Sequence, residues 1–537
     1  MTADMRMQDF ISEFTSKLAP LAREAAHARW QHQTEGGEVA EKRAAECGAR
    51  VAELFADPAK YAELRAIDAS ELTDPYLARQ HKILSLRFLT GQLDPETIKK
   101  MSAMTAELSG AYNSFRANLA GELVTDNQLD HVLLHSSESD YRKQAWEASK
   151  LVGAENASRI LQLVKLRNRE AHRMGFRDYY EMSLTTQEID ESYLFSILHD
   201  LEEETRPLWN RFRLTLDEKI ASQFNSTTDQ IRPWHHSNRF FQTVGSSEES
   251  EDDLFKSINV EEVTRRYFQQ IGLPVDDLLS HSDLYERPGK CQHAFCMNMD
   301  REGDVRVLFN LQPCKRWMTT NLHEYGHAVY EKYVDQSLPY LLRTCSHTMT
   351  TESIALMMGR LTDDVRWLIE FTDANPSDAL EIASRSRKAQ LEHQLVFMHW
   401  CFVMVNFEKE LYANPDQDLN TLWWDLVEKY QLVIRPEGRN APDWAAKIHV
   451  ASSPVYYHNY LLGDMMTSQL MDTIENEALK LIDKADRIRT HAFGTFLKDE
   501  VFAPGASVNW QEWLQLCTGR SLSPTAYVRE IEVMEHL

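Results

Sequence analysis

The stretch Thr319–Tyr330 most constrains what this chain can fold into, because it contains the pattern H-E-x-x-H. His323 and His327 are four positions apart, and such positions lie on one face of an α-helix. Two imidazoles at this spacing can bind one Zn²⁺ ion, so the pattern predicts a helix and a metal site together. Glu324 lies about 100° round the same helix, which suits a base that takes a proton from water beside the metal better than a third ligand.

A third metal ligand is predicted in the apolar segment Met349–Met358, which contains Glu352 as its one carboxylate. A buried carboxylate requires a counter-charge, and a zinc ion would supply it. Two histidines, one glutamate and an open fourth position are the ligands of a catalytic zinc site. Two alternatives stay open. His347 could be the ligand, although its surroundings do not indicate a buried helix, and Glu352 could simply be a helix charge that the dipole favours.

Helical periodicity continues through most of the sequence and predicts a mainly α fold. Phe10 and Phe14 begin a pattern of apolar residues at three- and four-residue spacing. Gly36 and Gly37 interrupt it, and a second helix is expected to end near Phe55. The chain therefore opens with a predicted helical hairpin.

A short β-hairpin is the clearest exception to helix. The segments His293–Met299 and Val305–Asn310 flank a polar turn that contains Gly303. This hairpin directly precedes the predicted metal-binding helix, so its edge could pair with the backbone of an extended peptide.

Composition narrows the partners and the compartment. The 537 residues carry a net charge of −24 and no basic cluster, which argues against nucleic acid and anionic membranes as partners. The longest apolar run, Leu395–Phe407, is too short to span a bilayer and predicts a buried helix. The N-terminus has no apolar signal segment, and the seven cysteines include no C-x-x-C pair. We therefore expect a cytoplasmic protein with reduced thiols.

A second group of reactive side chains lies in the segment Lys447–Tyr460. An imidazole and a tyrosine hydroxyl beside a metal can stabilise an oxyanion, and a lysine can hold a carboxylate. The alternative is a loop-to-helix junction whose aromatic side chains reach towards solvent.

Together these motifs resemble the angiotensin-converting-enzyme family of peptidyl-dipeptidases. The resemblance covers most of the chain and is strongest from about Trp234 to Leu470. The motifs that carry it are H-E-x-x-H with Glu352, Lys447-x-His449, the later tyrosines, Trp423-Trp424 with Lys429-Tyr430, His293-Ala294, and Ser237–Gln242.

The resemblance implies a helical fold in two halves around a deep central channel, with one Zn²⁺ per chain as cofactor. The implied zinc ligands are His323, His327 and Glu352. Glu324 would act as general base and then as general acid. His449 and Tyr460 would stabilise the oxyanion.

The resemblance also implies how a substrate is held. Gln242, Lys447 and Tyr457 would grip a free C-terminal carboxylate, and His293 with Ala294 would bind the substrate beside the metal. This clamp would restrict the enzyme to releasing dipeptides from the free C-terminus of short peptides.

The tyrosine pattern departs from the family. The interval from His449 to Tyr460 is one residue longer than in the animal members, so Tyr456 competes with Tyr457 for the carboxylate. We favour Tyr457, since its spacing from Tyr460 matches the tyrosine pair of the family.

Three further departures affect cofactors. Asn459 and Val427 stand where the animal enzymes carry arginines that are tied to chloride, which makes chloride activation doubtful. Leu356 replaces an aspartate that orients a zinc histidine, so zinc affinity could be lower or another group could substitute.

The chain is therefore expected to form one catalytic unit over residues 1–537. Residues 1–115 would form N-terminal helices with a lid-like hairpin, and residues 116–537 the helical halves that carry the H-E-x-x-H site. The alternatives are an endo-oligopeptidase that resembles thimet oligopeptidase and a non-catalytic scaffold. The sequence does not indicate an oligomeric state.

Overall fold

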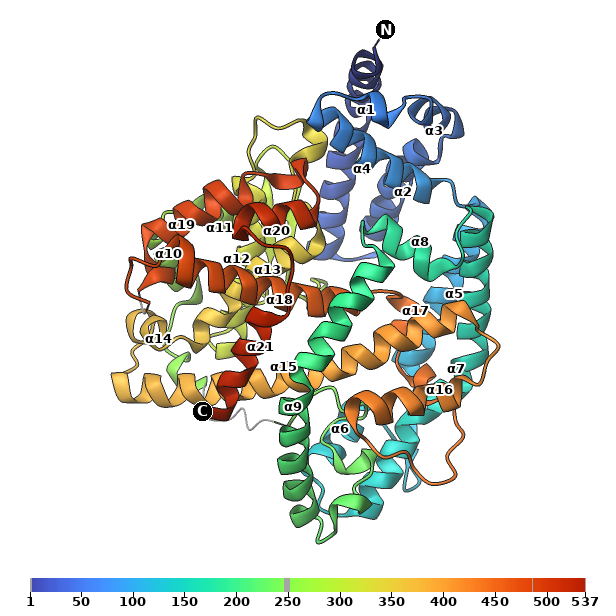
Figure 1. The fold of residues 1–537 in the computed structure, drawn as a ribbon, viewed down its shortest axis with the longest axis vertical. Helices are drawn as coiled ribbons and strands as arrows, with labels where there is room; N and C mark the ends of the chain where they lie inside the picture. Colours follow the sequence, from blue (N-terminus) through green and yellow to red (C-terminus); the bar gives the residue numbers. More distant parts are fainter. Residues whose placement is uncertain (1, 246–251, 485, 537) are drawn as a thin grey trace. The chain divides into compact units, whose positions relative to one another are not determined.

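The computed structural model describes residues 2–245, 252–484 and 486–536. Over these residues the chain is mainly α-helical, as predicted, with two small antiparallel sheets (Figure 1). One sheet pairs β1 (Ala117–Leu119) with β2 (Glu122–Val124). The other pairs β3 (Phe295–Asn298) with β4 (Val305–Leu308).

The chain divides into two compact units, and each is built from separated segments. Unit 1 comprises Met1–Gln92, Glu248–Ser386 and Leu462–Ala526, and unit 2 comprises Leu93–Ser247, Arg387–Leu461 and Tyr527–Leu537. The α-helices of unit 1 are α1 (Ala3–Glu35), α2 (Glu38–Ala56), α3 (Pro58–Arg65), α4 (Pro75–Gly91), α10 (Val260–Gln270), α11 (Asp276–His281), α12 (Lys315–Tyr333), α13 (Thr348–Gly359), α14 (Val365–Phe371), α19 (His491–Phe496) and α20 (Trp510–Thr518).

Unit 2 holds α5 (Pro95–Ser114), α6 (Asp126–His135), α7 (Ser139–Arg173), α8 (Tyr179–Thr186), α9 (Glu191–Gln223), α16 (Leu419–Leu426) and α17 (His449–Ser452). Three helices belong to both units in sequence: α15 (Pro376–Ala413), α18 (His458–Thr473) and α21 (Thr525–Glu532). The H-E-x-x-H motif therefore belongs to unit 1, and the segment Lys447–Tyr460 belongs to unit 2.

The predicted N-terminal hairpin is present as α1 and α2 of unit 1. Its turn falls at Gly36 and Gly37, whose φ angles of 67° and 85° lie in the region that favours glycine. The aromatic rings of Phe14 and Phe55 join the two helices at a centroid distance of 5.2 Å. Spacing at three and four residues thus buries one apolar face in the core of the hairpin.

The predicted β-hairpin also forms, although its strands are shorter than expected. Phe295 pairs with Leu308 and Asn298 with Val305, and both strands pack against α12. The run Leu395–Phe407 is an almost entirely buried part of α15, as predicted. Among the described helices, none combines the length and the apolar composition that crossing a membrane requires.

Candidate metal centre and substrate-binding residues

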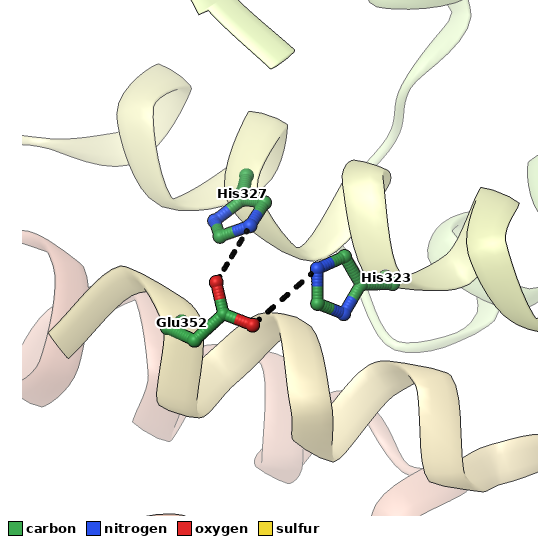
Figure 2. Close-up of side chains that lie close together, drawn as sticks. All are labelled: His323, His327 and Glu352. Atoms are coloured by element: carbon green, nitrogen blue, oxygen red, sulfur yellow. Dashed lines mark ion pairs between the residues drawn. The ribbon is translucent and has the colours of Figure 1, made fainter. Parts of the chain in front are cut away.

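The H-E-x-x-H motif lies in the middle of α12, so its two histidines project from the same helix face. Figure 2 shows His323 and His327 turned towards Glu352, which the neighbouring helix α13 contributes. The imidazole centroids are 5.0 Å apart and the rings stand almost perpendicular, at 87°. All three side chains belong to unit 1 and come from two packed helices.

The separations of the donor atoms suit a metal ion. His323 Nε2 lies 3.6 Å from Glu352 Oε1, and His327 Nε2 lies 3.5 Å from Glu352 Oε2. Donors bound to one tetrahedral zinc at about 2.0–2.2 Å are themselves about 3.3–3.6 Å apart. In the part of the chain that the structure describes, no other three His, Cys, Asp or Glu side chains are grouped closely enough to hold a metal. The residues present therefore fit zinc without rearrangement of the helices.

Hydrogen bonds behind the imidazoles orient them towards Glu352. His327 Nδ1 is 2.8 Å from the hydroxyl of Thr351, and the His323 ring bonds to the backbone of Ala355. A proton on Nδ1 of His327 would donate to this hydroxyl and leave the Nε2 lone pair facing Glu352. A hydroxyl and a backbone carbonyl thus orient the histidines in a chain that has Leu356 in place of the aspartate of the family.

Burial and mutual charge set the protonation of this group. Burial lowers the pKa of His323 to about 4, so this imidazole is neutral near pH 7. Burial also acts to lower the pKa of His327, but hydrogen bonding and charge from Glu352 outweigh it and raise that pKa. For Glu352 burial opposes ionisation, yet the two histidines lower its pKa overall. Each group of the pair His327–Glu352 thus favours the charged form of the other, and a metal ion bound here would compete with protons for His327.

Glu324 lies beside this set but outside it. Burial raises its pKa to about 7, while a hydrogen bond from the backbone N–H of Cys296 in β3 favours the charged form. A carboxyl group whose pKa lies near neutral can both accept and donate a proton at that pH. Its environment therefore suits general acid–base chemistry.

Gly326 permits the close packing that brings α13 to α12. A Cβ atom at this position would lie 2.8 Å from the Cα of Ala355, closer than real Cβ atoms approach backbone. The motif thus places its smallest residue where the helix carrying Glu352 passes. His347, the competing ligand, instead caps α13, since its Nδ1 accepts a hydrogen bond of 3.1 Å from the backbone N–H of Met349.

In unit 2, two of the predicted carboxylate-binding residues meet. Lys447 Nζ donates a hydrogen bond of 2.8 Å to Gln242 Oε1. The same ammonium lies 5.4 Å from the ring centroid of Phe240 and 5.3 Å from that of Trp400. Burial, with a smaller contribution from Arg239, lowers the pKa of Lys447 to about 8. The result is a half-buried cation in an aromatic cage, and a carboxylate would stabilise its charge.

The surroundings of Tyr456 and Tyr457 distinguish the two candidates. Tyr457 is only 3% exposed, and its ring lies 6.1 Å from Trp400, which also covers Lys447. Tyr456 is 36% exposed and packs its ring against Tyr460. Tyr457 is thus the tyrosine that shares the aromatic cage of Lys447.

His449 and Tyr460 lie next to this cage. The ring of Tyr457 is 5.6 Å from each of them. Burial and the charge of Lys447 lower the pKa of His449 to about 4, so the imidazole is neutral and can donate through one N–H. His293 and Ala294 lie elsewhere, just before β3 in unit 1, where His293 is exposed.

Several residues of the site carry no signal that sequence reasoning used. Thr351 acts through its hydroxyl and Ala355 through its backbone. Trp400 acts through its ring, which contacts Lys447 although the two residues are far apart in sequence. Among the residues that sequence reasoning missed, only Phe240 lies within a motif that carries the resemblance, two positions before Gln242.

A helical fold that brings H-E-x-x-H on one helix close to a glutamate on the adjacent helix is typical of zinc metallopeptidases. The chain belongs to the angiotensin-converting enzyme family, peptidase family M2, whose model matches residues 1–235 and 221–529. A search of curated proteins found no match.

Proposed function

We propose that the chain is a peptidyl-dipeptidase that releases dipeptides from the free C-terminus of oligopeptides. The observation that carries this proposal is the hydrogen bond between Lys447 and Gln242 inside an aromatic cage. An ammonium group in such a cage favours an anionic partner, and the anion that every unblocked peptide offers is its C-terminal carboxylate. An endopeptidase has less need of this arrangement.

In this proposal His323, His327 and Glu352 hold one zinc ion. Zinc, when bound, supplies a Lewis acid that polarises the scissile carbonyl and makes water more acidic. Glu324 accepts a proton from the attacking water and then donates it to the leaving amine. His449 and Tyr460 donate hydrogen bonds to the charge that develops on the carbonyl oxygen.

The clamp residues determine which peptide bond of the substrate is cleaved. Gln242, Lys447 and Tyr457 hold the C-terminal carboxylate, so the bond that reacts is two residues away from it. His293 and Ala294 hold the backbone of the substrate on the side of the metal set.

We also propose features on which the family match is silent. The 1–537 chain acts as one catalytic unit. Residues 1–115 form its N-terminal helices, and the α1–α2 hairpin among them acts as a lid. Asn459 and Val427 are uncharged, which favours activity without chloride. The odd number of cysteines, with no C-x-x-C pair, favours a reducing, cytoplasmic location.

The test is mass spectrometry of the products from one unblocked decapeptide, with and without a chelator, beside its C-terminally amidated twin. Stepwise loss of two residues from the unblocked peptide alone, abolished by chelation, is the expected result. Equal cleavage of both peptides or internal cuts would contradict the clamp and favour an endo-oligopeptidase. No cleavage by zinc-loaded protein would favour a scaffold.

A further inference from the structure

The segment that carries the tyrosines has an unusual backbone. Val455 has a φ angle of 53°, in the left-handed region that β-branched residues rarely adopt, and its side chain is 2% exposed. It lies two positions before Tyr457 and five before Tyr460. A residue keeps such a conformation only when its surroundings hold it there, and strained residues of this kind cluster at functional sites.

Two side chains from different helices hold the backbone of Val455. Glu408, a fully buried residue of α15, accepts a hydrogen bond of 3.0 Å from the Val455 N–H. Gln187, at the end of α8, donates one of 3.3 Å to the Val455 carbonyl. The backbone N–H and C=O of the strained residue Val455 are therefore both hydrogen-bonded to side chains and not to the backbone of a helix or strand.

The same side chains fix the rest of the segment. The Oε1 atom of Gln187 lies 3.2 Å from His458 Nε2 and accepts a hydrogen bond of 3.0 Å from Asn459 Nδ2. Arg167 of α7 donates to the carbonyl of Ala451 at 2.6 Å and to that of Val450 at 3.4 Å. The positive charge of the buried Arg167 also interacts with the carboxyl group of Glu408. Three helices of unit 2 thus reach the backbone or side chains of residues 450–459.

Burial of the polar side chains of Arg167, Gln187 and Glu408 costs free energy unless their donors and acceptors form hydrogen bonds. Each of the three makes at least one hydrogen bond to the segment between His449 and Tyr460, while Arg167 also donates to Tyr412 and Gln187 to Ser183. Their effect is to fix where Tyr457 and Tyr460 project.

We propose that Arg167, Gln187 and Glu408 are positioning residues that hold Val455 in its left-handed conformation, and that this hold sets the preference for a free C-terminus. The part concerning preference rests on the proposed function above. None of the three is assigned to touch the substrate. They act through the backbone that presents the tyrosines.

The first test is a double-mutant cycle between Glu408→Leu and Val455→Gly. Glycine adopts a positive φ without strain, so it removes the need for the hold. Glu408→Leu should lower the ratio of kcat/KM for unblocked over amidated decapeptide at least tenfold. In the Val455→Gly background the same change should cost less than threefold. The cycle compares losses within each background, so the cost of deleting the buried valine side chain cancels.

Two controls sharpen the result. Glu408→Gln retains an acceptor and should behave as wild type, and Glu410→Leu, on the exposed face of the same helix, should have no effect. Equal losses from Glu408→Leu in both backgrounds, or an unchanged ratio, would overturn the proposal. If Glu408→Leu does not fold, Gln187→Met gives a second cycle from a half-buried position, in which the lost contacts with His458 and Asn459 are common to both backgrounds and the loss should again be smaller with Val455→Gly.

A second readout does not depend on catalysis. The peptide spanning residues 450–460 should exchange its amide hydrogens at least tenfold faster in Glu408→Leu than in wild type, because the Val455 N–H loses its buried acceptor. Faster exchange with no cleavage of any peptide would support the hold and reject the proposed function. Unchanged exchange would reject the hold even in an active enzyme.

Discussion

The candidate metal ligands of unit 1, called the metal set, and the proposed carboxylate clamp of unit 2 are assembled in opposite ways. His323, His327 and Glu352 come from two adjacent helices, and helical spacing alone aligns the two histidines. Gln242 and Lys447 come from segments 205 residues apart, and their encounter depends on the fold of the whole unit. Local geometry thus assembles the candidate metal ligands, and long-range packing assembles the proposed carboxylate clamp.

The two regions also differ in their electrostatics. In the metal set, two imidazoles and one carboxylate partly compensate one another, so each charge has a partner before metal binds. In the clamp, a single ammonium faces an amide oxygen and aromatic rings. We therefore expect changes in the metal set to act on turnover and metal content, and changes in the clamp to act on substrate discrimination.

The largest effect is expected from Glu324→Gln. Removal of the base should reduce kcat by about 10²- to 10⁴-fold, the usual contribution of a positioned acid–base group. Zinc content, measured by elemental mass spectrometry, should stay at the wild-type level because Glu324 is not a ligand. If Glu324→Gln lost zinc together with activity, Glu324 would contribute to metal binding and would not act as a base alone.

The next effect concerns the hydroxyl that orients His327. Thr351→Val should weaken zinc binding by about 10- to 100-fold, as for other partners of metal ligands. A competitive chelator titration measures this directly. Thr348→Val, at an exposed position of the same helix, is the matched control. Equal affinity in wild type and Thr351→Val would show that the hydroxyl does not hold the imidazole.

The proposed clamp should respond to pH through Lys447. The ammonium of Lys447 must be protonated to bind a carboxylate, and it loses that proton as pH rises through a pKa of about 8. The ratio of kcat/KM for unblocked over amidated peptide should fall about tenfold between pH 7 and 9, since the titration of Glu324 near pH 7 affects both peptides equally and cancels. Lys447→Arg keeps its charge in this range, so it should remove this alkaline decline. An equal decline with both peptides, which leaves the ratio unchanged, would assign the titration to another group.

The smallest effect on the site is expected from Gly326→Ala. The added Cβ would force α12 and α13 apart, so the free energy of unfolding should fall by about 1–3 kcal/mol. Gly48→Ala, in a helix with open space around that position, should be neutral or stabilising by up to about 1 kcal/mol. Thermal unfolding of both variants measures this difference. Discrimination between unblocked and amidated peptide should not change in either, since the clamp belongs to unit 2.

Much of unit 1 could be predicted because its information is local. Apolar spacing located the α1–α2 hairpin, a glycine-containing turn located β3 and β4, and a four-residue repeat put His323 and His327 on one face. The carboxylate in an apolar helix pointed to Glu352, which α13 does bring to the histidines. Each of these features depends on residues within one or two turns, or on one neighbouring element.

The clamp was named from resemblance, and its physical basis appeared only in the folded chain. Trp400 and Phe240 form the cage of Lys447 from distant segments, and no spacing in the sequence indicates that contact.

By itself, the sequence determined the helical class and pointed to the candidate metal ligands and the candidate base, because helix periodicity and donor chemistry are properties of neighbouring residues. Only the tertiary structure decided which groups orient the imidazoles, which tyrosine shares the cage, and that Glu408 holds Val455 in a left-handed conformation. Burial, pKa shifts and backbone strain arise when segments far apart in sequence exclude water together, and no local pattern contains that information.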